Sequence, residues 1–376
     1  MTLRRLENIF YLGVKELRSL RHDTVLLVLV LYAFTYAIYS AATGTSSELR
    51  NTAIAVVDED HSPLSGRLTD SFLKPYFREP REILASEIDD AMDTGRYTFV
   101  LDIPPDFERD VLRGRQPQLQ VNIDATAMLQ AGAGARYIQG IVADDLLAFV
   151  QRSTAPSPAA ARLSTRIRFN PNLTSAWFVS VMELINNVTM LAMILAGGAL
   201  IREREHGTVE HLLVMPLHPY EIMLAKVWAN GLVVLVGAAL ALWLMVHGLL
   251  GVPIAGSVPL FLVGTILYLA SATSLGILLA TLARSMPQFG LLFILVVLPM
   301  IILSGGNTPL ESMPEGLQRF MEVFPSTHFV RFAQAILYRG AGFDVVWPDF
   351  AAVAGIGAVF FAVALLRFRK TVTLAQ

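Results

Sequence analysis

The 376-residue sequence contains no cysteine. The chain therefore forms no disulfide, offers no thiolate nucleophile and has no cysteine ligand for zinc or an iron–sulfur cluster. Charged residues are also scarce, at 16% of the chain against about 25% in an ordinary soluble domain. The formal net charge of −2 provides no basic surface for nucleic acid, so nucleic acid is excluded as a partner.

Catalytic motifs are missing as well. The sequence has no GxxxxGK[ST] loop to hold a nucleotide phosphate, no HExxH zinc motif and no GxSxG nucleophile elbow. Asp58, Asp60 and Ser62 imitate the start of a calcium loop, but Pro63 stands where that loop needs glycine and Thr69 where it needs glutamate. We expect these acids to cap helices. The sequence thus predicts a protein that is not an enzyme and binds no metal or cofactor itself.

Hydrophobic residues, in contrast, make up 54% of the chain and are gathered in long uncharged blocks. A helix crosses the roughly 30 Å hydrocarbon core of a bilayer with about 20 apolar residues. Six blocks meet or approach this length, and the fifth is the shortest. They cover residues 25–42, 177–201, 222–250, 257–282, 289–303 and 350–366.

The short loops indicate an orientation, because cytoplasmic flanks of membrane helices are rich in Lys and Arg. Basic residues lie before the first block and after the second, fourth and sixth, whereas loop 251–256 has no charge. Both termini are therefore predicted to be cytoplasmic, including a tail over 367–376, with residues 43–176 outside. A cleaved signal peptide ending near Ser40-Ala41-Ala42 is the alternative for the first block, although its apolar core is longer than usual.

The segment 1–24 is predicted to be an amphipathic cytoplasmic helix. Its apolar residues recur at spacings of three and four and are separated from the basic residues. Such a helix lies on the inner membrane surface or packs on a partner protein. The apolar positions are Leu3, Leu6, Phe10, Val14 and Leu17.

The insert 43–176 alternates strand and helix patterns, which predicts a compact α/β domain with its own core. Ser86 is expected to cap one of its short helices. Expected strands cover residues 52–57, 97–103 and 118–123; expected helices cover 64–73, 86–92, 105–112 and 128–151.

Polar residues inside the apolar region single out two further segments. Glu183, Asn186 and Asn187 share a helix face in the second block and either line an outer substrate path or bond to neighbouring helices. Segment 304–345 contains Pro325 between apolar helical patterns, and we expect two short helices that dip back into the outer leaflet or lie on its surface.

Small residues at every fourth position allow helices to approach closely. We therefore expect two such stripes to pack against neighbouring helices. One is Ala272, Gly276 and Ala280, and the other is Ala354, Ala358 and Ala362.

The inner loop, residues 202–221, is the most informative segment. Gly207 and Thr208 supply a turn and an N-cap, Glu210 suits the first helical turn, and Pro216 ends a short apolar run that includes Leu212 and Leu213. This pattern predicts a short helix with an excess of apolar surface, which either sinks into the lipid headgroups or fits a groove on a partner.

This loop resembles the signature of ABC exporter permeases of the second type, and the remaining layout of the chain is similar to theirs. The segments LARSMPQFGLL and FVRFAQAILYRGAGFDVVWP are also similar to one group of inner-membrane permeases in that family. The residues that carry the loop motif are Glu203, Arg204, Glu205, Gly207, Thr208, Glu210, Leu212, Leu213 and Pro216.

The resemblance implies a six-span α-helical membrane protein of the cell inner membrane with a large periplasmic α/β domain between its first and second spans, in which the inner loop couples to a separate ATP-binding subunit. That subunit would bind ATP and Mg. A second permease copy or a homologous permease would complete the translocation unit, with a membrane-fusion protein and an outer-membrane channel as further partners. Export of drugs or other amphiphilic compounds is the expected function.

Two alternatives belong to other classes. A proton-driven exporter would need about 5.5 kcal/mol to shift a carrier between its states, whereas one proton crossing 100 mV supplies about 2.3 kcal/mol. A membrane receptor would explain the periplasmic domain, but the short inner segments provide no output module. Both alternatives are separated from an ATP-driven exporter by co-purification with an ATPase.

Overall fold

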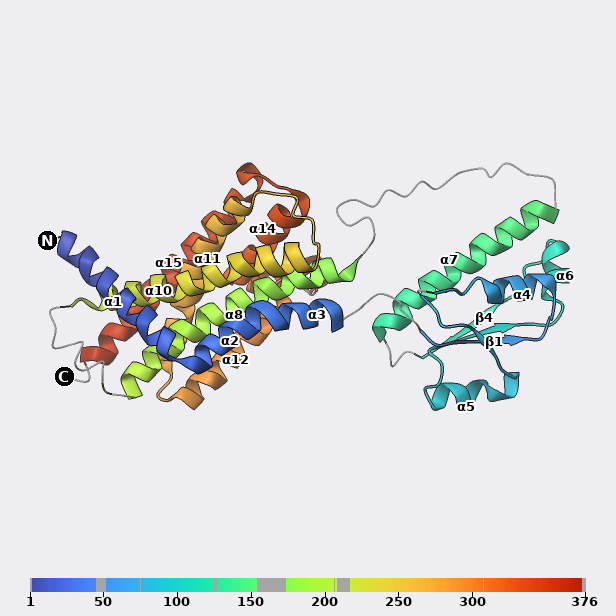
Figure 1. Ribbon diagram of the computed structural model, residues 1–376, viewed down its shortest axis with the longest axis horizontal. Coiled ribbons are helices and arrows are strands. Elements are labelled where there is room, and N and C mark those ends of the chain that lie inside the picture. The colour runs from blue at the N-terminus through green and yellow to red at the C-terminus, as the bar shows by residue number, and fades with distance from the viewer. Residues whose placement is uncertain are drawn as a thin grey trace. The chain divides into compact units, whose positions relative to one another are not determined.

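The computed structural model describes residues 2–44, 52–74, 76–124, 128–153, 174–205, 207, 217–306 and 308–373 (Figure 1). The chain divides into two compact units, Met1–Gly44 with Ala176–Gln376 and, between these two segments, Thr45–Ser175. The first unit is helical and the second is an α/β unit.

In the described part of the chain, six helices are long and apolar enough to cross a membrane, as expected. The fifth is one helix with Pro299 inside it. The first consists of α2 (Thr24–Tyr32), the π-helical segment η1 (Ala33–Ala37) and α3 (Ile38–Gly44). The third is α10 (Pro219–Leu240), continued by the π-helical segment η4 (Ala241–Leu249). The second, fourth, fifth and sixth are single helices: α8 (Ser175–Glu205), α11 (Val258–Leu282), α12 (Met286–Leu303) and α15 (Phe343–Thr373).

Helix α8 lies at the centre of the helical unit. It is buried along most of its length, whereas most residues of the first span, α12 and α15 are half-buried or exposed. It runs parallel to α11, where the Thr189 and Tyr268 hydroxyls are 2.7 Å apart. Further along, the carbonyl oxygen of Met193 lies so close to Gly276 that a Cβ there would be only 2.4 Å away. Glycine at 276 therefore sets the distance between these two helices.

The two stripes of small residues differ in outcome. The stripe on α11 is buried, which confirms its packing role. The stripe on α15 is exposed, so it does not pack on a helix of the same chain, and its packing role stays a prediction. Helix α15 instead faces α11 through Gly357, whose added Cβ would lie 2.9 Å from the Ser271 Cβ.

Segment 304–345 contains two short helices beyond a 3-10 turn η5 (Leu310–Ser312): α13 (Glu315–Met321) and α14 (Pro325–Arg339). Pro325 starts α14, as its fixed φ favours. One face of α14 is buried against α11 and α15, and its Phe329 ring stacks on Tyr268 at a centroid distance of 4.0 Å.

Helix α1 (Thr2–His22) packs along α10 and ends at Asp23, whose carboxylate accepts the Leu26 amide and caps α2. Leu6 and Phe10 of the predicted apolar stripe are exposed. The exposed Phe10 ring nevertheless stacks on Trp228 of α10 at a centroid distance of 6.0 Å, beside the face of α1 that is buried there. The sequence thus predicted an amphipathic helix correctly but did not identify α10 of the same chain as its packing partner.

The α/β unit contains a four-stranded sheet in the order β2-β1-β3-β4, in which only the pairing of β3 with β4 is antiparallel. Apolar side chains alternate between its faces, with α4, α6 and α7 on one face and α5 on the other (Figure 1). The elements are β1 (Ile54–Asp58), α4 (Pro63–Asp70), β2 (Arg81–Glu82), the 3-10 turn η2 (Ala85–Glu87), α5 (Ile88–Asp93), β3 (Phe99–Ile103), α6 (Phe107–Leu112), β4 (Gln120–Ile123) and α7 (Met128–Ser153).

Of the two acids that imitate the start of a calcium loop, Asp60 caps a helix, as expected, whereas Asp58 accepts the Asp60 and His61 amides of the loop before α4 and does not cap a helix. Asp58 accepts the Ser65 hydroxyl at 2.7 Å, and Asp60 accepts the Glu108 amide at the start of α6. Hydrogen bonds from Ser62 and from the amides at the start of α6 lower the pKa of Asp60, outweighing the opposite effect of burial. The expected cap at Ser86 was wrong, because Glu87 occupies the N-cap position of α5.

Candidate functional site

Helix α8 ends in four consecutive charged residues, Arg202 to Glu205, and we call the last three of them, Glu203, Arg204 and Glu205, the ERE clamp. Neighbouring residues of an α-helix point about 100° apart, so three in a row point in three directions. In this structure each of the three side chains reaches a different part of the bundle. The clamp lies immediately before the inner loop, which makes this end of α8 the candidate functional site.

Glu203 joins α8 to α1 and α10. One carboxylate oxygen lies 2.8 Å from the Lys226 ammonium of α10, and the other lies 3.3 Å from the Lys15 ammonium of α1. Lys226 also contacts the Glu16 carboxylate of α1 at 2.8 Å. The Lys226 side chain is only 1% exposed, and a buried ammonium is tolerated because carboxylates surround it.

Arg204 joins α8 to the end of α11. Its guanidinium donates to the carbonyl oxygens of Ala280 at 3.2 Å and Ala283 at 2.9 Å. The last carbonyls of a helix have no intrahelical partner and carry partial negative charge. A cation is therefore well placed there, and α8 is held against the C-terminal end of α11.

Glu205 joins α8 to the start of α12. Its carboxylate accepts the Met286 amide at 2.8 Å, which satisfies one of the free donors at this helix N-terminus. A negative charge at that position is also favoured by the helix dipole. The clamp thus binds the ends of α11 and α12 as well as α1 and α10.

The inner loop begins where the clamp ends. Gly207 adopts a φ of +68°, which terminates α8, and its amide donates to the Arg204 carbonyl at 3.1 Å. On the far side of the loop, the Glu221 carboxylate accepts the His218 amide at the start of α10. The remaining predicted coupling residues lie outside the described residues: Thr208, Glu210, Leu212, Leu213 and Pro216.

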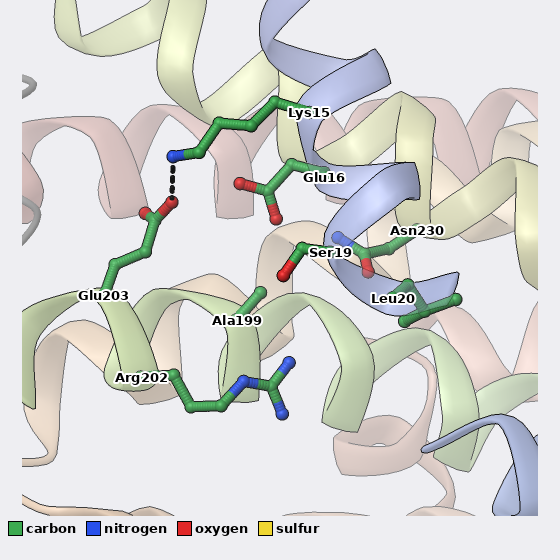
Figure 2. Close-up of a pocket in the computed structure, with 8 residues that line it drawn as sticks. All are labelled: Lys15, Glu16, Ser19, Leu20, Ala199, Arg202, Glu203 and Asn230. Carbon is green, nitrogen blue, oxygen red and sulfur yellow. Dashed lines mark hydrogen bonds and ion pairs between the residues drawn. The ribbon is translucent and has the colours of Figure 1, made fainter. Parts of the chain in front are cut away.

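A cavity of about 300 Å³ opens between α1, α8 and α10 beside Glu203 (Figure 2). Figure 2 shows the Lys15 ammonium on the Glu203 carboxylate and the Glu16 side chain facing the same space. Burial raises the pKa of Glu16, the nearby Glu203 reinforces this change, and Lys226 opposes it. The residues lining the cavity are Lys15, Glu16, Ser19, Leu20, Ala199, Arg202, Glu203 and Asn230.

Sequence reasoning missed Lys226 and Glu16. The available signal was Lys226, a lysine inside the third apolar block, because an ionisable residue within a span is normally paired and functional. The ERE residues were expected to belong to the coupling motif of the inner loop, and the structure places their side chains against helices of their own chain. Their expected role in coupling stays a prediction. In this structure, the elements that they hold are helices of the same chain.

The predicted substrate-path residues separate on α8. Asn187 is buried, and its amide donates to the Ala33 carbonyl oxygen at 2.8 Å and to Glu183 at 3.2 Å. Ala33 opens η1, where the hydrogen-bond register of the first span changes. Glu183 and Asn186 are half-buried. Asn187 thus bonds to a neighbouring helix, and a path lined by Glu183 and Asn186 stays a prediction.

Comparison with known proteins finds one family and several relatives. The family described as "ABC-2 family transporter protein" matches residues 24–366. Inner membrane transport permease YhhJ of Escherichia coli (strain K12) is 58% identical over 370 residues, covering 98% of this chain and 99% of that protein. Probable multidrug ABC transporter permease YbhR of the same organism is 29% identical over 361 residues, covering 95% of this chain and 97% of that protein. Probable multidrug ABC transporter permease YbhS, also of that organism, is 26% identical over 341 residues, covering 88% of this chain and 88% of that protein. The chain therefore belongs to the ABC-2 family of transporter proteins.

Proposed function

We propose that this chain is the membrane subunit of an ATP-driven exporter in the cell inner membrane. The observation that carries the proposal is the family match over nearly all the spans, together with the ERE clamp at the start of the inner loop. The sequence has no phosphate-binding loop, so ATP and Mg would be bound by a separate subunit.

The orientation follows from basic residues at one end of the bundle. Arg202 and Arg204 of α8, Arg284 after α11 and the basic residues of α1 occur at helix ends that a six-span layout places on one side. Cytoplasmic flanks attract such residues. This arrangement supports an orientation with both termini and the inner loop in the cytoplasm and the α/β unit in the periplasm.

The clamp supports coupling through the inner loop. Residues 208–216 would dock on the ATP-binding subunit, with Leu212 and Leu213 as the apolar contacts and Glu210 in the first turn. A displacement of this loop pulls on the end of α8. Because the clamp holds α1, α10, α11 and α12 to that end, the displacement reaches four other helices directly.

The relatives support a class of substrate, and the further partners are part of the same proposal. YbhR and YbhS are named as probable multidrug permeases, which supports drug-like or other amphiphilic compounds as cargo. The half-buried Glu183 and Asn186 would line the path, and a second copy or a related permease would close it. A periplasmic membrane-fusion protein and an outer-membrane channel would continue the route.

Reconstitution tests the proposal. The purified chain in proteoliposomes should neither hydrolyse ATP nor move a fluorescent cationic dye, and adding its ATP-binding subunit should confer both activities. The matched control is the same complex with the phosphate-loop lysine of the ATP-binding subunit replaced. Dye transport by the chain alone under a pH gradient would favour the proton-driven alternative, and absence of transport in the complex would refute the proposal.

A further inference from the structure

Lys226 and Glu221 are the two charged side chains that are only 1% exposed among the described residues, and Lys226 joins two helices besides its own. Its ammonium lies 2.8 Å from Glu16 on α1 and 2.8 Å from Glu203 in the ERE clamp. Removing one partner of a buried ion pair leaves an uncompensated charge, which is costly. The position of α1 is therefore linked electrostatically to the end of α8.

The rest of the interface shows that α1 is docked on α10 over several turns. A Cβ at Gly13 would lie 2.1 Å from the Trp228 ring, so only glycine fits without a shift at this position. The Trp228 indole donates to the Ile9 carbonyl oxygen at 3.1 Å. Ile9, Gly13, Glu16 and Leu20 follow one another at spacings of four, three and four, which places them on one face of α1.

The remaining charges near Lys226 leave no substitute for Glu16. Lys15 binds the other oxygen of Glu203, and Arg202 of α8 pairs with Asp23 at 3.7 Å. Glu16 and Glu203 are thus the two carboxylates in contact with Lys226 among the described residues. Neutralising Glu16 leaves Lys226 to share Glu203 with Lys15.

We propose that Lys226 is a positioning residue for coupling: by binding Glu16 and Glu203 together, it makes α1 move with the end of α8 when the ATP-binding subunit displaces the inner loop. This inference rests on the proposed function for the source of the displacement. The docking of α1 on α10 does not depend on the proposed function, because it can be measured in the purified chain without a partner.

The first test compares Glu16→Gln with Glu7→Gln, a matched change at an exposed position of the same helix. In the reconstituted complex, Glu16→Gln should retain ATP hydrolysis but lose transport by about tenfold or more, because one partner of a buried charge is gone. Glu7→Gln should leave both rates within about twofold of the unmodified complex. A purely structural defect would lower hydrolysis and protein yield together.

The second test replaces the ionic link with a covalent one. Because the chain has no cysteine, Ser19→Cys on α1 and Asn230→Cys on α10, which line the same cavity, form the only possible disulfide. Oxidation should restore transport to the Glu16→Gln variant, and reduction should abolish it again. The same disulfide in the otherwise unmodified protein should leave transport intact, since α1 stays docked during the cycle.

Three results would overturn the inference: equal transport by Glu16→Gln and Glu7→Gln, failure of the disulfide to restore transport, or loss of transport when the disulfide forms in the otherwise unmodified protein. A separate measurement tests the docking of α1 even if the proposed function is wrong. In the purified chain without any partner, Glu16→Gln should lower the rate of disulfide formation relative to Glu7→Gln, and equal rates would refute the docking role whatever the protein transports.

Discussion

The close contact between α8 and α11 gives a prediction whose size can be worked out from the structure. A Cβ on residue 276 would lie 2.4 Å from the Met193 carbonyl oxygen and 2.8 Å from its Cα. Both are backbone atoms, so neither can rotate away. In Gly276→Ala the two helices must separate by roughly 0.6 Å, because packed interiors tolerate little overlap.

That separation would also strain contacts above and below the glycine. The hydrogen bond between Thr189 and Tyr268 and the two bonds from Arg204 to α11 span the same pair of helices. Overpacking of this kind costs about 1 to 3 kcal/mol. For a unit of this size, each kcal/mol lowers Tm by about 2 to 4 °C, so Gly276→Ala should melt about 2 to 12 °C below the unmodified protein.

Thermal unfolding of the detergent-solubilised protein, followed by the loss of its monodisperse elution peak, measures this difference. The matched control is Gly290→Ala on α12, where a Cβ meets no atom within 4 Å. That change should raise Tm slightly or leave it unchanged, because alanine favours a helix over glycine by about 1 kcal/mol. If Gly276→Ala were as stable as Gly290→Ala, the packing argument for this helix pair would be wrong.

Three further predictions concern charge and topology. Burial raises the pKa of Glu16 above its ordinary value of 4.5. This carboxyl therefore favours the folded state most at pH values below 4.5, and that contribution is lost as the pH rises through its folded pKa. The Tm of the unmodified protein should consequently fall relative to the Tm of Glu16→Gln as the pH increases over this range, and a constant difference in Tm would contradict the prediction. Glu210→Lys should cost only about 0.3 to 1 kcal/mol through its interaction with the helix dipole, but about 2 kcal/mol or more if it breaks a contact with the partner. The amount of protein in the membrane should therefore stay normal while transport and substrate-stimulated hydrolysis fall. Normal transport by this variant would count against the loop as the docking element. In intact cells from which the outer membrane has been made permeable, a membrane-impermeant thiol reagent should label Asp93→Cys but not Arg284→Cys, and the reverse labelling would refute the proposed orientation.

The membrane spans could be predicted from the sequence because they depend on local properties of each segment. Length and hydropathy alone decide whether a segment can cross a bilayer, and the expected and observed helices overlap in all six cases. A capping role for Asp60 was expected from its place between a strand and a helix, but the helix that it caps is α6, where the bonded Glu108 amide lies 48 residues further along the chain. The two-residue strand β2 was missed because Arg81 and Glu82 have no apolar periodicity.

The partners of side chains could not be predicted, because spacing along a helix does not say which neighbour it meets. The stripes around Gly276 and Ala358 have the same spacing, yet the first is buried and the second exposed. The ERE residues were recognised as a motif, but their contacts with Lys226, α11 and α12 depend on residues 23 to 81 positions away along the chain. Only the packed bundle brings these groups together.

The ERE clamp restricts the kind of motion that the end of α8 can make. Its three side chains leave the helix in three directions, so a rotation of α8 about its own axis would break all three sets of contacts at once. A tilt of the whole end, carrying its neighbours along, would preserve them. Inserting one residue into α8 just before Glu203 would turn the clamp by about 100° and aim every one of its charges at the wrong helix.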